Sequence, residues 1–310
     1  MSLLDVMVVG QMARDLVLSV GDVPPPGTSA RVKERKEMLG GKGANQAVSF
    51  AQLGKSVGLV SIVGDDQVGD WLLDQAQRDG IDVTYVHRRP GIASGLVVDV
   101  VDDRARWRYL EDLPETVLVT EEDIERATGA LSGAAAVVIQ LQQPPSAAML
   151  AARTARAAGA MVVLDGSPVD GPERDSLLAA ADVVRADAHE AELLAGQAVD
   201  SADAAVSAAR RLLSLGPRLA ALAFPRGNAV VWESGSAVLP LTEVTVADTT
   251  GGGDAFLATL ATALLHGCDP QQAGLLATAA AGTTVARLGG RPRLSWPVLL
   301  EESARLAYPA

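Results

Sequence analysis

Three consecutive glycines at 251–253 stand directly before an acidic residue, Asp254. Each glycine inside a helix would cost about 1 kcal/mol relative to alanine, so the run is expected to lie outside one. Apolar residues then recur at helical spacing over 256–265, and Gly267 stands where such a helix would end. The glycine amides therefore open a helix N-terminus, which is a site for phosphate or for a developing oxyanion. A carboxylate beside it suggests a base that works next to a transferring phosphoryl group.

A second glycine-rich stretch, 40–47, also precedes a helical pattern. Its spacing matches neither the Walker P-loop nor the dinucleotide-binding motif G-x-G-x-x-G. Together the two stretches resemble the paired signatures of the ribokinase-like (PfkB) family of sugar and nucleoside kinases. Gly-Gly-Lys-Gly-Ala-Asn at 40–45 is similar to the family's first motif, and Asp-Thr-Thr-Gly-Gly-Gly-Asp-Ala-Phe at 248–256 is similar to its second. The resemblance extends over most of the chain, from 8 to 292.

Composition and charge exclude several classes of protein. The 310 residues are 48% hydrophobic, enough for one large α/β domain spanning 1–310. A net charge of −12 argues against nucleic acid or an anionic membrane surface as a partner. No stretch approaches the ~20 apolar residues of a membrane span, and no signal peptide is recognisable. The single cysteine, Cys268, fits a reducing cytoplasm.

Apolar runs that alternate with helical patterns predict a doubly wound, mostly parallel sheet flanked by helices. We expect buried strands at 4–9, 57–63, 135–139, 161–164, 183–184, 219–224 and 229–232. Helices are expected at 121–131, 145–158, 177–180, 188–194 and 202–215.

More polar strand pairs near the N-terminus do not fit this alternation. They lie at 15–20 with 29–38, and at 94–101 with 105–110. As in the family, they suggest a small β lid inserted in the same domain and contributed by about 12–38 and 92–111. Exposed strand edges in such a lid favour a homodimer formed through it.

The resemblance implies a role for each motif residue. Asp254 is the base that accepts the proton of a substrate hydroxyl, and the amides of Gly251, Gly252 and Gly253 hold the transferring phosphate. Alanine is usual in the family where Gly252 stands, and either residue keeps the amide. The residues implied to face the substrate are Asp15, Gly41, Lys42, Asn45, Gln142 and Asp254 itself.

Two departures from ribose kinases concern the sugar. Ala13 stands where the family has an asparagine, and Gln142 stands where it has a glutamate. A site built for one hydroxyl pattern discriminates sharply against others. Ribose is therefore not expected to be the best substrate.

On the nucleotide side, Asp187 and Glu190 replace the family's Asn-x-x-Glu, which organises Mg²⁺ and phosphate through water. An aspartate still suits a hydrated Mg²⁺. The family's Thr-x-Gly-x-x-Gly loop is altered, because Ala223 lacks the hydroxyl of its threonine, Pro225 lacks the N–H and the freedom of its first glycine, and Asn228 stands at its closing glycine. Arg226 either binds phosphate in their stead or lies in solvent.

Further residues complete the implied nucleotide site. Gly253 contributes its amide to the ATP phosphate, and Thr278 stands where ribose kinases have a histidine near the adenine. A monovalent cation such as K⁺ is a further option. Its ligands would be the side chain of Asp248 and the carbonyl groups of Thr250, Thr284, Arg287 and Gly289. A nearby cation, Arg293, disfavours K⁺ there.

Three functional alternatives remain open. The first is an ATP-dependent sugar kinase. The second is a nucleoside kinase of the same family, for which Trp107 and Tyr109 are the nearby aromatic residues that could stack a base. The third is a sugar-binding or regulatory protein whose nucleotide site is degraded, which Ala223 and Pro225 suggest.

Overall fold

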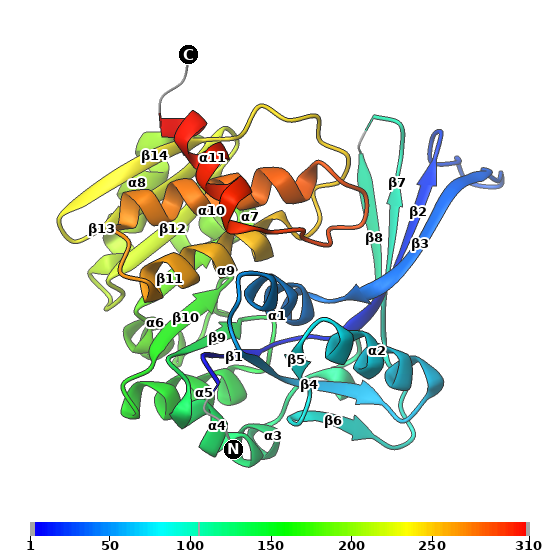
Figure 1. Cartoon of the computed structure of the whole chain (residues 1–310), viewed down its shortest axis with the longest axis horizontal. Coiled ribbons are helices and arrows are strands. Elements are labelled where there is room, and N and C mark those ends of the chain that lie inside the picture. The colour runs from blue at the N-terminus through cyan, green and yellow to red at the C-terminus, as the bar shows by residue number, and fades with distance from the viewer. Residues whose placement is uncertain (1–3, 105, 308–310) are drawn as a thin grey trace.

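A ten-stranded, mostly parallel sheet runs through the molecule, as the computed structural model shows for residues 4–104 and 106–307 (Figure 1). Its order is β14-β13-β12-β11-β10-β9-β1-β4-β5, and β6 pairs with β4. Within the described residues, β13 pairs antiparallel with both β12 and β14, and the other strand pairs of this sheet are parallel. The strands are β1 (Val6–Val9), β4 (Val57–Gly64), β5 (Ile81–Asp82), β6 (Val86–Arg89), β9 (Ala136–Gln140), β10 (Met161–Asp165), β11 (Val183–Ala186), β12 (Leu219–Phe224), β13 (Gly227–Trp232) and β14 (Gly235–Pro240). The predicted fold class is confirmed.

Helices cover both faces of this sheet, because alternate residues of each buried strand point to opposite sides. In β1, Val6 and Val8 belong to one hydrophobic core, and Met7 and Val9 to the other. The first core includes α1 (Lys42–Gln52), α2 (Gln67–Arg78), α9 (Gly252–Leu265), α10 (Pro270–Val285) and α11 (Trp296–Ala307). The second includes α3 (Glu121–Arg126), α4 (Thr128–Gly133), α5 (Pro145–Ala157), α6 (Arg174–Ala180), α7 (Ala188–Ala195) and α8 (Ala202–Leu213).

Two helix predictions need correction. The helix expected at 121–131 is divided at Ala127, next to Thr128, whose hydroxyl bonds back to the carbonyl of Ile124. Such a side-chain bond competes with regular helix geometry. Helix α9 has no single apolar face, because it is buried on all sides from Asp254 to Ala263, where it packs against α1 and α10.

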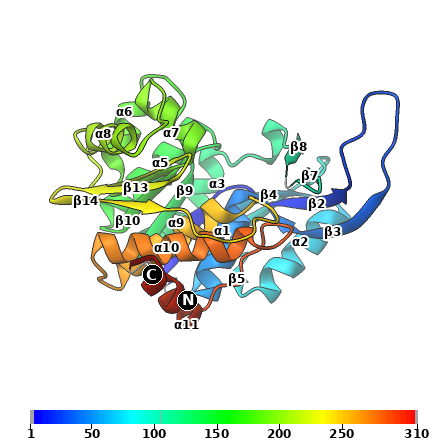
Figure 2. The same ribbon diagram turned by 90° about the horizontal axis from the view of Figure 1, so that it is seen from above.

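A second, four-stranded sheet stands to one side of the first (Figure 1). Its order is β3-β2-β7-β8, made of β2 (Ala13–Val20), β3 (Val32–Gly40), β7 (Gly95–Val101) and β8 (Trp107–Asp112). Figure 2 shows the β2–β3 hairpin reaching away from the layers of the main sheet. The predicted start of the last strand, at 105, lies outside the described residues. Among the helices that are described, none is long and apolar enough to cross a membrane.

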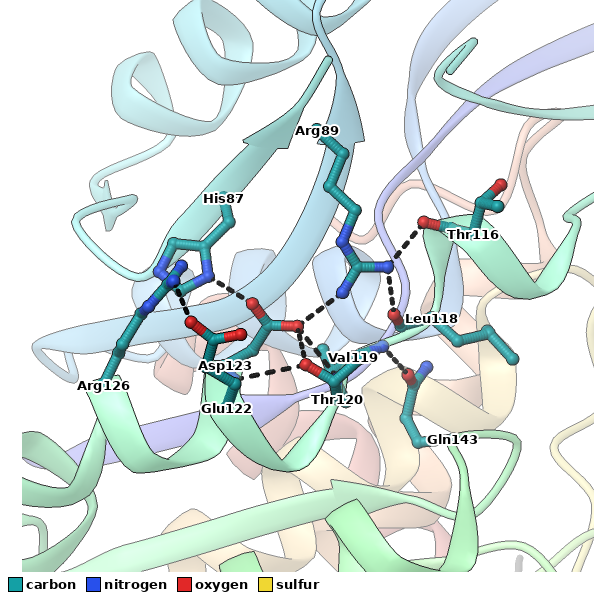
Figure 3. Close-up of polar contacts among 10 residues, drawn as sticks. All are labelled: His87, Arg89, Thr116, Leu118, Val119, Thr120, Glu122, Asp123, Arg126 and Gln143. Atoms are coloured by element: carbon teal, nitrogen blue, oxygen red, sulfur yellow. Dashed lines mark hydrogen bonds and ion pairs between the residues drawn. The ribbon is translucent and has the colours of Figure 1, made fainter. Parts of the chain in front are cut away.

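Asp123 fixes the chain where it returns from this second sheet (Figure 3). Its carboxylate lies 2.6 Å from His87 Nδ1 and accepts a hydrogen bond of 2.6 Å from Arg89 Nη2, both on β6. Arg89 also donates to the carbonyls of Thr116 and Leu118. These bonds tie α3 and the short 3₁₀ turn at Glu115–Val117 to β6, so the returning segment is held against the main sheet.

Candidate active site

Asp254 lies in the first turn of α9 and is only 6% exposed. Gln46 of α1 holds it, because Gln46 Nε2 donates to Asp254 Oδ1 at 3.1 Å and to Asp165 Oδ2 at 2.8 Å. Burial raises the pKa of Asp254 to about 6, and the negative charge of Asp165 raises this pKa too, while Lys42 and Arg185 oppose the rise. A carboxyl group with this pKa is ionised at neutral pH and can still accept a proton.

The glycines before Asp254 are required by their surroundings. Gly251 has φ +72°, and a β-carbon there would lie 1.9 Å from the carbonyl oxygen of Gly290. A β-carbon on Gly253 would lie 2.3 Å from Nη2 of Arg185. A side chain is therefore excluded at Gly251, and one at Gly253 would have to displace the Arg185 guanidinium, so the backbone amides at the start of α9 stay bare. The Arg185 guanidinium packs directly against this anion hole.

Two cations and three carboxylates surround the same point. Arg185, at the end of β11, donates to Asp165 Oδ1 at 3.0 Å. Lys42, at the start of α1, donates to Glu190 Oε1 at 3.0 Å. Desolvation lowers the pKa of Lys42, but the negative charges of Asp165 and Glu190 outweigh this effect and raise the pKa. The ammonium group therefore stays charged. The arrangement places two cations beside Asp254, where a transferring phosphoryl group would need them.

Asp187 and Glu190 cap the N-terminus of α7 reciprocally. Asp187 Oδ1 accepts from the Glu190 amide at 2.8 Å, and Glu190 Oε2 accepts from the Asp187 amide at 2.8 Å. Among the described residues none donates to Asp187 Oδ2. The pair thus leaves one half-buried carboxylate oxygen for a hydrated Mg²⁺, which fits the predicted role.

The loop at 223–228, which departs from the family's nucleotide-binding pattern, forms the β12–β13 hairpin. Pro225 and Arg226 make its exposed two-residue turn, and Ala223 pairs with Asn228 across it. Thr278 lies inside α10, where its hydroxyl donates to the carbonyl of Gly274 at 2.9 Å. Neither segment therefore offers the nucleotide a free threonine hydroxyl.

The sugar-side residues come from three elements. Asp15 on β2 is buried, and its Oδ1 has no hydrogen-bond partner. Burial raises its pKa to about 7, and the charges of Asp254 and Asp99 add to the effect, which places these carboxylates near one another. Gly41, with φ +85°, and the buried Asn45 open α1. Gln142 is exposed and accepts a hydrogen bond of 2.6 Å from Gln140.

The loop considered as an optional monovalent-cation site is held partly by its own hydrogen bonds. Asp248 Oδ1 accepts from the amide and the hydroxyl of Thr250 at 2.9 and 2.6 Å, and Oδ2 accepts from the Gly289 amide at 2.7 Å. The Thr284 carbonyl accepts from the Arg287 amide at 3.2 Å. Nearby, Lys36 Nζ lies 3.4 Å from the carbonyl of Leu288. The engagement of Asp248 within the loop and the nearby ammonium of Lys36 both disfavour K⁺ at this place.

Tyr109 of β8 reaches from the second sheet to the anion hole. Its hydroxyl lies 2.5 Å from Thr250 Oγ1, next to Gly251. The ring of Trp107 stacks on it with centroids 4.6 Å apart. Both aromatic residues suggested for stacking a base are therefore engaged with each other.

The comparison with known proteins agrees with this geometry. The family described as pfkB family carbohydrate kinase matches residues 3–297. The chain belongs to this family. It is 28% identical to a ribokinase of Haemophilus influenzae, with 92% of this chain and 93% of that protein covered. It is 29% identical to a deoxyribokinase of Salmonella typhi, with 82% and 83% covered.

The fold also agrees with that of solved ribokinases. The structure of Arabidopsis thaliana ribokinase superposes with a TM-score of 0.81 at 23% identity, covering 97% of this chain and 99% of that one. This member of the family is thus a carbohydrate kinase, a phosphotransferase with an alcohol group as acceptor.

Sequence reasoning missed Gln46, Asp165, Arg185 and Asp99 in this kinase. Asp165 ends β10, Arg185 is the residue before the end of β11, and the two are direct neighbours in the register of these strands. A polar residue that ends an apolar strand at the carboxyl edge of a parallel sheet is a signal that could have found both.

Proposed function

We propose that this kinase transfers the γ-phosphoryl group of ATP to a hydroxyl group of a small carbohydrate. The observation that carries the proposal is a buried, ionisable Asp254 beside bare helix amides and the guanidinium of Arg185. Phosphoryl transfer requires chiefly that the partners are positioned and that charge is neutralised, and this arrangement offers both.

In this scheme Asp254 accepts the proton of the attacking hydroxyl. Gln46 fixes the carboxylate by donating to Oδ1. The amides of Gly251, Gly252 and Gly253 receive the transferring group, and Arg185 and Lys42 offset its negative charge. Asp187 and Glu190 would hold Mg²⁺ through water, and the ion would neutralise further negative charge on the phosphates. ATP as the donor is supported by the Arabidopsis ribokinase, whose structure is described as complexed with ribose and ATP.

The acceptor site comprises Asp15, Gly41, Lys42, Asn45 and Gln142. Lys42 lies between the two sites, since its ammonium contacts Glu190 of the nucleotide motif. The departures at Ala13 and Gln142 favour a sugar other than ribose. The second sheet would act as a lid over this site within a single domain, 1–310. We also propose a reducing cytoplasm as the compartment, because the chain has a single cysteine, Cys268, and so cannot form an internal disulfide.

A substrate panel tests the proposal. ADP release from Mg·ATP would be measured with pentoses, hexoses, keto-sugars and nucleosides, and each compound would also be tested for thermal stabilisation of the protein. We expect a sugar other than ribose to give the highest kcat/KM. A nucleoside at the head of the panel would support the nucleoside-kinase alternative. Sugar binding without any ADP release would support a binding protein instead.

A further inference from the structure

Asp99 lies on the face of the second sheet that contacts the anion hole. It stands opposite Tyr109 of β8 and Val17 of β2 in the sheet register. Side chains of Asp15 and Val17 share this face, because residues two apart on a strand point the same way. Tyr109 reaches Thr250 from the same face, so Asp99 faces the acceptor side of the site.

The carboxylate of Asp99 lacks a donor. The side chain is 2% exposed, and its Oδ1 has no hydrogen-bond partner. Its Oδ2 lies 3.3 Å from Thr250 Oγ1, but the single proton of that hydroxyl has a closer acceptor in Asp248 Oδ1, at 2.6 Å. A buried carboxylate with no donor is strongly unfavourable, which points to a donor that is supplied by a ligand.

Negative charge around Asp99 also exceeds positive charge. Asp15 has a second unpartnered oxygen, and Asp248 and Asp254 add two further carboxylates. The pKa of Asp99 is raised to about 7 by burial and by the charge of Asp248. The two cations of the site are already paired, Arg185 with Asp165 and Lys42 with Glu190.

We propose that Asp99 is a specificity-determining residue which, with Asp15, receives the protonated amino group of an amino-sugar acceptor. The inference rests on the proposed kinase function and names the class of its substrate. A hydroxyl group offers one donor and no charge, whereas an ammonium group offers three donors and a positive charge. A single ammonium group can donate to both free oxygens and also balance their charge, whereas hydroxyl groups could supply the donors but not the charge.

Paired sugars test the inference. The value of kcat/KM would be compared for hexoses and pentoses that carry an amino group, for the parent sugars with a hydroxyl at the same carbon, and for the N-acetylated forms. We expect at least one amino sugar to exceed its parent by tenfold or more and to lose that advantage on acetylation. Asp99→Asn should bring the ratio to within threefold. The control Asp112→Asn, an exposed carboxylate on the same sheet, should preserve it.

Thermal shifts of the wild-type protein, measured without ATP, give a second readout that does not require turnover or a folded variant. The amino sugar should stabilise the protein more than its parent does. Equal values for amino and parent sugars, or a preference that survives in Asp99→Asn, would overturn the inference while leaving the kinase assignment intact. Absence of turnover with every sugar would count against the proposed function, and the thermal shifts would still decide whether the amino group is selected.

Discussion

We propose Arg185, rather than Arg226, as the arginine that binds phosphate. Its guanidinium packs against Gly253, whereas Arg226 lies in an exposed turn. Arginine binds phosphate bidentately, and its charge does not depend on pH in the physiological range. The hydrogen bonds lost at Ala223 and Pro225 can therefore be replaced from the anion hole itself.

Substitution of the two arginines separates these roles. A hydrogen bond to a charged group contributes about 1.5–3 kcal/mol, so Arg185→Ala should weaken ATP binding roughly 10- to 100-fold. Arg226→Ala should weaken it only a few-fold, since that side chain lies at the turn. Calorimetric titration with Mg·ATP measures both. The reverse order of effects would return the phosphate-binding role to Arg226.

The pKa of Asp254 predicts a pH profile. A base must be deprotonated, so kcat/KM should rise with pH through about 6 and level off above it. Because Arg185 lowers the pKa of Asp254, Arg185→Ala should move this limb to higher pH. Initial rates from pH 5 to 8, at constant ionic strength, would show it. A profile that stays flat over this range would contradict the assignment of Asp254 as the base.

At the level of elements, the loop before α9 is held by its own hydrogen bonds. Asp248 binds the amides of Thr250 and Gly289, and the carbonyl of Gly290 closes on Gly251. Lys36 from β3 places its ammonium by the same loop. The segment is thus ordered by protein groups in the place where a bound cation would otherwise organise it.

We therefore expect turnover to be independent of monovalent cations. Rates in K⁺, Na⁺ and a bulky ammonium salt at equal ionic strength should agree within about twofold. Lys36→Met removes the ammonium and should make the rate sensitive to K⁺. An activation of tenfold or more by K⁺ in the wild-type protein would show that the loop binds the ion after all.

Over the whole molecule, the strands of the main sheet were predictable because their apolar runs are buried on both faces. The short strands β5 and β6 and the edge strand β14 were not, since they lack such runs. In the site, the motif residues around Asp254 follow from local patterns of glycine and charge. The pairing of Asp165 with Arg185 depends on which strands are neighbours, which no local pattern reveals.

Asp99 could not be predicted from a local pattern either. Alone in the sequence it is one acid among 38 acidic residues. Only the register of β7 against β8 and β2 brings it beside Tyr109 and turns it toward Thr250. Its burial without a donor is a property of the assembled sheet.

A homodimer through the second sheet remains a proposal with a direct test. Leu110 and Trp107 on β8 are 66% and 47% exposed, and β8 is an edge strand. An exposed apolar edge favours association with a second copy. Leu110→Glu should give a monomer in light scattering after gel filtration. Leu193→Glu, an exposed leucine on α7, is the control that should leave the mass unchanged, and a wild-type monomer would refute the dimer.

Asp254→Asn tests the role of Asp254 as the base with the least change in shape. Turnover with the best sugar should fall roughly 10²- to 10⁴-fold, the range for loss of a general base, because the amide cannot accept the proton. Sugar affinity, measured by calorimetry on the same variant, should stay within a few-fold. A variant that retains half of the wild-type turnover would contradict the mechanism.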